Sequence, residues 1–237
     1  MNLIKEQWSK SDIQPFLSFL QTYQQKEKEA WARNMLNTKL SLLVIPTKVM
    51  YDIVDDIYKG NYRSYLELEI FDYYETIAIY GKLLTKISNF KEMLPYLTKY
   101  CEVMENWAHC DLLSFPIHQD NQQDYIQLSH DYSKDSRPFV RRLSLMILFQ
   151  MVKDETILPL IFDHLIQQSN EQEYYVIMMA GWLLSECIIQ HKEPTLQFLK
   201  EHPHLNKKIV NKGIQKCRES RRLSQDEKDA LNAYKRK

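Results

Sequence analysis

Residues 174–184, YYVIMMAGWLL, form a run of eleven residues without a charged side chain. A helix that is apolar on every side is normally buried on most of its surface. The run is too short to cross a bilayer, which takes about 20 apolar residues. It therefore predicts an inner helix in a fold of stacked helices.

The rest of the chain shows the same helical periodicity, broken by short polar segments and by Gly60-Asn61. The pattern predicts helices over residues 12–26, 31–42, 47–58, 65–84, 89–107 (one or two helices), 124–133, 137–152, 157–168, 174–190, 193–201, 207–219 and 224–236. Only 4 of the 237 residues are glycine, which disfavours sheets because their turns and bulges need glycine. Paired helices spaced by roughly 35–45 residues are typical of a HEAT-like solenoid. We predict an all-α fold with one domain over residues 1–237.

Composition excludes several other classes. The chain has no apolar run of 18 residues, and its first 14 residues carry four charged side chains, so we expect neither a membrane span nor a signal peptide. The cysteines are Cys101, Cys110, Cys187 and Cys217. Their spacing matches no CxxC or zinc pattern, and we expect mostly buried, reduced thiols in a cytoplasmic protein.

Charge is unevenly distributed along the chain, although the formal net charge is zero. Residues 200–237 contain 12 Lys+Arg and 5 Asp+Glu, a local charge of +7. Such a basic segment can hold phosphates, although a solvated helical tail has the same composition. The zero net charge limits non-specific affinity for DNA, which depends mainly on neutralised phosphates.

The segment 106–111, NWAHCD, carries the first candidate for chemistry. Trp107 and Asp111 are four residues apart, so a helix would present both on one face. A tryptophan face attracts cations, and a carboxylate can stabilise positive charge developing on a sugar ring or orient a water molecule. An isolated pair with this spacing also suits a core tryptophan and an aspartate at a helix end.

Two further candidates lie in the second half of the chain. Arg141 and Arg142 stand near a helix start, where positive charge opposes the helix dipole. An anionic partner would explain the pair, and two solvated arginines are the alternative. Trp182 interrupts the buried run beside Gly181, which allows the close approach of a helix or a ligand. For Trp182, core packing is the simpler interpretation.

Cofactor motifs are missing from the sequence. None of the seven histidines has the spacing of a metal site, and the chain contains neither a P-loop nor a GxGxxG motif. We expect no metal, no nucleotide cofactor and no other cofactor.

Five segments, taken together, resemble the AlkD-related DNA alkylation repair proteins, which include alkylpurine DNA glycosylases. The resembling motifs, in chain order, are MxNTK from Met35, NWxxCD from Asn106, FxRR from Phe139, YYVxMxxxWxxSE from Tyr174 and NKxIQKxRES from Asn211. They cover the chain from about residue 30 onward. Each motif is weak alone, but their order and spacing make the set fairly specific.

The resemblance implies a helical solenoid with a concave groove that binds alkylated duplex or branched DNA. In the catalytic relatives, a cationic N3- or N7-alkylpurine is excised without being flipped into a pocket, unlike the usual glycosylase strategy. By motif, Asp111 would stabilise the oxocarbenium ion, and Trp107 and Trp182 would be the two aromatic walls. The residues expected to hold the DNA backbone are Arg142, with Arg141 as the alternative in register, and the C-terminal Lys212, Lys216, Arg218, Arg221 and Arg222.

The sequence departs from the catalytic pattern at three places. Ser185 stands where active relatives have an arginine, and Asn106 replaces the first tryptophan of their WW pair. Residues 43–46 replace a Gly-x-x-x-Pro turn. The superfamily also contains non-enzymatic DNA-binding members, some of which prefer branched DNA.

Three functions therefore stay open. The one we favour is DNA binding with weak or no base excision. The alternatives are an active monofunctional alkylpurine glycosylase, and a helical solenoid that binds proteins and has no role on DNA. We expect a monomer in each case.

Overall fold

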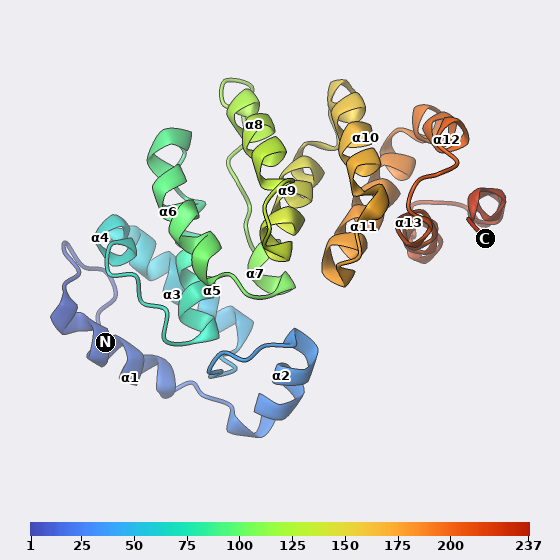
Figure 1. The fold of residues 1–237 in the computed structure, drawn as a ribbon. Helices are drawn as coiled ribbons and strands as arrows, with labels where there is room; N and C mark the ends of the chain where they lie inside the picture. The colour runs from blue at the N-terminus through green and yellow to red at the C-terminus, as the bar shows by residue number, and fades with distance from the viewer. The chain divides into compact units, whose positions relative to one another are not determined.

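The apolar run forms helix α11 (Tyr174–Gln190) in the computed structural model, which describes residues 1–237. Every regular element of the chain is helical, and there is no strand (Figure 1). Ten residues of α11 are buried against neighbouring helices. The all-α prediction is confirmed, and α11 has the buried position that its composition predicts.

The first of two compact units comprises residues Met1–Pro116. Its helices are α1 (Ile13–Gln21), α2 (Glu29–Leu36), α3 (Thr47–Lys59), α4 (Tyr62–Leu66), α5 (Tyr74–Leu84), α6 (Phe90–Val103) and α7 (Trp107–Asp111). Helix α5 is central to the unit, since α3, α4, α6 and α7 all pack on it. Its burial is correspondingly high, with nine of eleven residues in the core.

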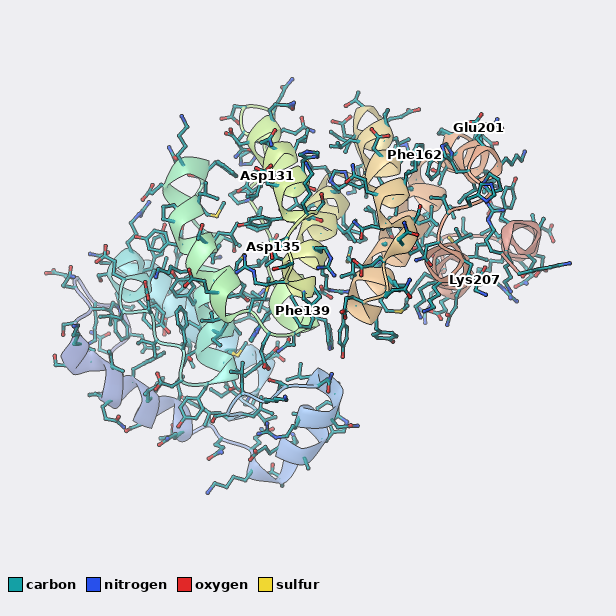
Figure 2. All side chains as sticks on the ribbon, in the orientation of Figure 1. Asp131, Asp135, Phe139, Phe162, Glu201 and Lys207 are labelled. Carbon is teal, nitrogen blue, oxygen red and sulfur yellow. The ribbon has the colours of Figure 1, made fainter.

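The second unit comprises Ile117–Lys237. Its helices are α8 (Gln122–Tyr132), α9 (Pro138–Met151), α10 (Leu158–Gln167), α11, α12 (Lys192–Glu201), α13 (Lys207–Glu219) and α14 (Gln225–Ala230). Helix α11 is central here, packing on α9, α10, α12 and α13, while α8 packs on α9. Helices α10 and α12 also have an aromatic contact, because Phe162 of α10 (labelled in Figure 2) stacks on Phe198 of α12 with 4.0 Å between ring centroids.

The single helix predicted over residues 65–84 is wrong. Helix α4 ends at Leu66 and α5 begins at Tyr74, and between them Glu69 adopts the left-handed conformation with φ 48°. No glycine or proline marks the break, and apolar residues continue at helical spacing across it, so periodicity alone could not reveal it. The backbone of Tyr73 is extended, and its N–H donates to Thr76 Oγ1 at 3.1 Å, which starts α5.

The helix predicted over residues 31–42 is also too long. Helix α2 ends at Leu36 because Asn37 takes the left-handed conformation with φ 51°. Asparagine adopts this conformation more readily than other residues with a side chain, and it commonly ends helices. The following residues cross towards α3 without helical structure.

The remaining predictions agree with the structure to within a few residues, apart from the two chain ends. There α1 and α14 are shorter than predicted and adjoin short 3-10 helices. The segment 89–107 forms two helices, α6 and the start of α7. All four cysteines are buried, and none forms a disulfide. No helix combines the length and the apolar character that crossing a membrane requires.

Candidate functional site

Helix α7 is short, and its start is fixed by Asn106. The Asn106 side-chain oxygen accepts hydrogen bonds from the backbone N–H groups of Ala108 at 2.9 Å and His109 at 3.1 Å. This satisfies two of the donors that a helix start leaves unpaired. Asn106 is only 1% exposed. The position where active relatives carry a tryptophan therefore holds a buried helix cap.

Trp107 and Asp111 are the first and last residues of α7. The Trp107 ring is partly buried and packs against a small apolar cluster formed by Ala32, Leu36 and Leu42. Asp111 is partly exposed and lines a pocket in the first unit. The predicted pair thus lies on one helix, with the tryptophan anchored in packing and the carboxylate at a surface opening.

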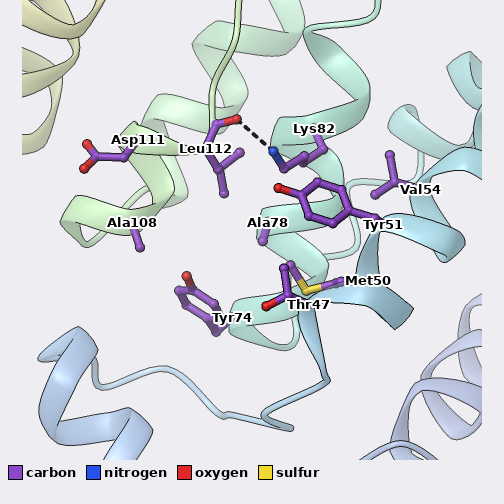
Figure 3. A pocket seen from close by; sticks show the side chains of 10 residues that line it. All are labelled: Thr47, Met50, Tyr51, Val54, Tyr74, Ala78, Lys82, Ala108, Asp111 and Leu112. Carbon is purple, nitrogen blue, oxygen red and sulfur yellow. Dashed lines mark hydrogen bonds between the residues drawn. The ribbon is translucent and has the colours of Figure 1, made fainter.

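The pocket beside Asp111 has a volume of about 260 Å³. Its lining residues come from α3, α5 and α7 with the residue that follows it: Thr47, Met50, Tyr51, Val54, Tyr74, Ala78, Lys82, Ala108, Asp111 and Leu112. Figure 3 shows the Asp111 carboxylate at the edge of this set, pointing away from Lys82 and Tyr51. The Lys82 ammonium lies 4.8 Å from the centroid of the Tyr51 ring and donates to the Leu112 carbonyl at 3.3 Å.

His109 connects α7 to α5 beneath the pocket. Its ring stacks on that of Tyr74 with 4.5 Å between centroids, and its Nε2 lies 3.2 Å from the Tyr74 carbonyl oxygen. Burial lowers the pKa of His109 to about 4, so the ring is neutral at neutral pH. Burial, followed by the nearby charges of Glu75 and Asp111, raises the pKa of Tyr74, which therefore keeps its hydroxyl proton.

The segment before α3 is held by a buried carboxylate. Glu75 accepts from the backbone N–H groups of Leu43 at 3.1 Å and Val44 at 2.6 Å. Val44 has φ 56°, an unusual conformation for a β-branched residue. Burial raises the pKa of Glu75, and its backbone hydrogen bonds oppose that shift without cancelling it. This is the segment in which the sequence departs from the Gly-x-x-x-Pro turn, and it contains one left-handed residue, Val44.

The arginine pair lies near the start of α9, just after Phe139 (Figure 2). Arg141 forms an ion pair with Glu171 at 2.9 Å and donates to the carbonyls of Asp135 and Ser136. Arg142 is 5% exposed and donates to the Tyr175 carbonyl at 2.6 Å. Positive charge near a helix start is unfavourable, and an anionic partner is expected to compensate for it. For Arg141 that partner lies within the protein and is Glu171.

Trp182 lies on the partly exposed side of α11, where its ring packs on that of Phe149 at 4.6 Å between centroids. Ser185, one turn later, is 2% exposed, and its hydroxyl donates to the Trp182 carbonyl at 2.7 Å. The Cys217 thiol of α13 donates to the Ser185 carbonyl at 3.6 Å. The position of the arginine in active relatives is thus buried beside α13.

Helices α11 and α13 approach closely through two glycines. A Cβ atom on Gly181 would lie 2.8 Å from Lys212 Cβ and Cγ, and one on Gly213 would lie 3.1 Å from the Gly181 carbonyl oxygen. The sequence predicts the close approach of either a helix or a ligand at Gly181, and the structure shows a helix, α13. The contact also places the stem of Lys212 against α11.

The predicted basic residues of the C-terminal segment are mostly exposed and mostly engaged with neighbours. Lys216 pairs with Glu219 at 3.0 Å, and Arg222 pairs with Glu186 of α11. Lys212 donates to Gln215 and Arg218 to Asn232, at 3.3 and 3.4 Å, and Arg221 is exposed. These bonds lie at the surface, where exposed ion pairs contribute little stability and exchange readily.

The structure therefore brings Trp107 and Asp111 together in the first unit, and places Trp182 with all the predicted DNA-holding cations in the second. Sequence reasoning missed Tyr51, Tyr74 and Lys82, which lie on helices far from Asp111 in the chain. Nowhere do three or more histidine, cysteine, aspartate or glutamate side chains gather in a way that could hold a metal ion.

Comparison with known proteins identifies a family over most of the chain. Residues 16–216 match the family described as DNA alkylation repair enzyme. Neither a curated protein nor a solved structure matches the chain. The family match includes α7, the arginine pair of α9, and α11 with its tryptophan. The chain therefore belongs to the DNA alkylation repair enzyme family.

Proposed function

We propose that this protein binds DNA and excises alkylated bases weakly or not at all. The observation that carries the proposal is the burial of Asn106 and Ser185, at 1% and 2% exposure. These are the two positions at which active relatives present an aromatic ring and an arginine. Here both side chains are used in local structure, so neither can stack on a cationic base or hold a phosphate.

The DNA-binding part of the proposal rests on the family and on the C-terminal cations. Lys212 and Arg222 lie against α11, the helix that carries Trp182. Their bonds to Gln215 and Glu186 are at the surface, and they can be exchanged for phosphate contacts. The other predicted contacts in this group are Lys216, Arg218 and Arg221. In this proposal the two units together form one HEAT-like solenoid domain over residues 1–237, whose concave groove holds the DNA.

Arg141 and Arg142 have a different role in the proposal. Arg142 is buried and bonded to the carbonyl of Tyr175, at the start of α11. Arg141 is paired with Glu171 and would reach a phosphate only by leaving that partner. We assign them a secondary part in DNA binding, in which they fix the start of α11 and add positive potential.

An active glycosylase is the second candidate, and Asp111 favours it. Its carboxylate stands at the opening of a pocket with tyrosines on its wall, one turn after Trp107. A carboxylate there can stabilise an oxocarbenium ion as a cationic base departs. Lys82 opposes this candidate, because its ammonium lies in the same pocket and repels a cationic base.

The deciding experiment measures the release of free 7-methylguanine and 3-methyladenine from alkylated duplex DNA, with Asp111→Asn as control. We expect release no faster than the control, together with binding to the same DNA that weakens steeply as salt increases. Release that disappears in Asp111→Asn would establish a glycosylase. Absence of any salt-sensitive DNA binding would favour the protein-binding solenoid.

A further inference from the structure

Three tyrosines on α3 and at the start of α4 lie beside positively charged side chains. Lys82 lies 4.8 Å from the Tyr51 ring centroid, and Lys86 lies 5.2 Å from that of Tyr58. The guanidinium of Arg63 lies 5.0 Å from the Tyr62 centroid. We name these six residues the tyrosine stripe. At one end of the stripe the rings of Tyr58 and Tyr62 pack on each other, with 5.0 Å between their centroids.

The stripe reaches the surface of the first unit through Tyr51 and Tyr58, whereas Tyr62 is only 8% exposed. Tyr51 and Tyr58 are 47% and 42% exposed, among the most exposed large apolar side chains of the chain. They are seven residues apart on α3, which places them on one face about 10 Å apart along the helix. Core packing does not explain why the rings of Tyr51 and Tyr58 are exposed, whereas a surface that binds a flat ligand would use exposed rings.

The stripe leads into the pocket beside Asp111. Tyr51 and Lys82 belong to both, and Met50 and Val54 supply an apolar wall next to Tyr51. Figure 3 shows the Tyr51 ring and the Lys82 ammonium close together at one side of this pocket. A flat ring stacked at Tyr51 would therefore meet apolar surface on one side and a cation on the other.

The nearby acidic side chains are largely compensated. On α3, Lys48 pairs with Asp52 at 3.0 Å and Lys59 pairs with Asp56 at 2.7 Å, whereas the exposed Asp55 takes part in neither ion pair. At the far end, Arg63 is paired with Glu92. Lys82 and Lys86 have no carboxylate partner among the ion pairs of the structure, so their charge is available to an anionic ligand.

Exposed tyrosines interleaved with lysines match the chemistry of one strand of nucleic acid. Unpaired bases stack on aromatic rings, and lysines contact the phosphates between them. A duplex offers its phosphates to the lysines but not its base faces to the tyrosines. A cation over an exposed ring is a weak contact, so a base can replace it.

We propose that the tyrosine stripe is a second DNA-binding surface, which holds an unpaired strand with its bases on Tyr51 and Tyr58 and its phosphates on Lys82 and Lys86. None of the six stripe residues is a predicted site residue, although the stripe borders the pocket beside Asp111. The stripe shares with the proposed function the class of partner, DNA, and this pocket.

The test is the affinity of the full chain for a fluorescein-labelled oligothymidine of about 16 nucleotides, a length within the usual site sizes of single-strand binders. Removing both rings in Tyr51→Ala/Tyr58→Ala should weaken binding roughly tenfold or more, as expected for the loss of two stacked bases. The variant Tyr51→Phe/Tyr58→Phe keeps the ring faces and should bind within about twofold of the wild type, because stacking needs only the face. Tyr23→Ala, an exposed tyrosine outside the stripe, is the matched control.

Two outcomes overturn the proposal: equal affinity of the alanine variant and the wild type, or an equal loss in the phenylalanine and alanine variants. Far-ultraviolet circular dichroism and thermal unfolding show whether each variant is folded. Lys212→Gln/Arg222→Gln, measured on a blunt duplex, tests the proposed function separately. Loss of duplex binding in that variant with oligothymidine binding intact would show two independent surfaces.

Discussion

The two helices that carry the candidate tryptophans are built in different ways. Helix α7 has five residues, too few to be stable alone, and depends on the Asn106 cap and on the stacking of His109 on Tyr74. Helix α11 has seventeen residues and is held by packing on four neighbours. Capping and one buried histidine therefore position Trp107, whereas extensive core contacts position Trp182.

Asn106 and Ser185, two of the three departures from the catalytic pattern, have a common explanation. Asn106 caps α7, and Ser185 is buried at the contact of α11 with α13, where its backbone carbonyl accepts from the Cys217 thiol. In each case a buried side chain stands at a position where the resemblance implies an exposed functional one. Substitutions at Ser185 in α11 and at His109 and Asn106 in α7 should therefore affect stability to different extents.

The largest effect is expected from Ser185→Arg, which restores the arginine of active relatives. Ser185 is buried beside α13, so the guanidinium would be placed without a partner or would separate the helices. We expect the free energy of unfolding to fall by about 3–5 kcal/mol, as for other uncompensated buried charges. Urea denaturation measures it, with Gln190→Arg at the exposed end of the same helix as control. A stable variant that gains base release would show instead that Ser185 limits catalysis.

Acidification should weaken the α7 region through His109. The unfolded chain binds a proton at an ordinary histidine pKa of 6.5, whereas the folded protein does so only at about 4. The unfolded state therefore binds more protons between these values, and stability falls as the pH is lowered from 6.5 to 4. The loss reaches about 3 kcal/mol at pH 4.

The measurement for His109 is the difference in unfolding free energy between wild type and His109→Gln at several pH values. Glu75 acts in the opposite direction, because its raised pKa makes the folded state take up a proton first, but it is common to both proteins and cancels. We expect the variant to lose stability less steeply with acid. Parallel curves for the two proteins would contradict the assignment.

A smaller effect is expected from Asn106→Ala. The substitution removes the acceptor of two backbone N–H groups at the start of α7, and loss of a helix cap costs about 1–2 kcal/mol. Asn61→Ala is the matched control, because Asn61 caps α4 from an exposed position through Ser64 N–H. Equal losses at the two caps would mean that burial of Asn106 adds nothing.

The long, strongly periodic helices could be predicted from the sequence. The limits of α11 and α13 agree with the prediction to the residue, because α11 contains a continuous apolar run and α13 has apolar residues at helical spacing, each flanked by polar residues. The break inside 65–84 could not be predicted. The break depends on the left-handed conformation of Glu69. No glycine in the sequence marks this position, and the conformation must be stabilised by tertiary contacts.

The candidate site was predictable only where its residues are close in sequence. The W-x3-D spacing identifies Trp107 and Asp111, which share a helix. The pocket around Asp111 needs Tyr51, Tyr74 and Lys82, which come from α3 and α5. Glu171, the partner of Arg141, is likewise 30 residues away. Such contacts follow from how helices pack, and local patterns do not record them.

The smallest effect is expected at Val44, which packs, like Trp107, against the apolar cluster of Ala32, Leu36 and Leu42. Its φ of 56° is favourable for glycine and strained for residues with a Cβ. Val44→Ala loses apolar packing and keeps the strain, whereas Val44→Gly loses the packing and relieves it. We therefore expect the glycine variant to be the more stable of the two by about 1 kcal/mol, the reverse of the usual order at positions with negative φ. Thermal unfolding of the two variants measures this. An alanine variant more stable than the glycine variant would mean that Glu75, which binds the Leu43 and Val44 N–H groups, holds the turn without appreciable strain.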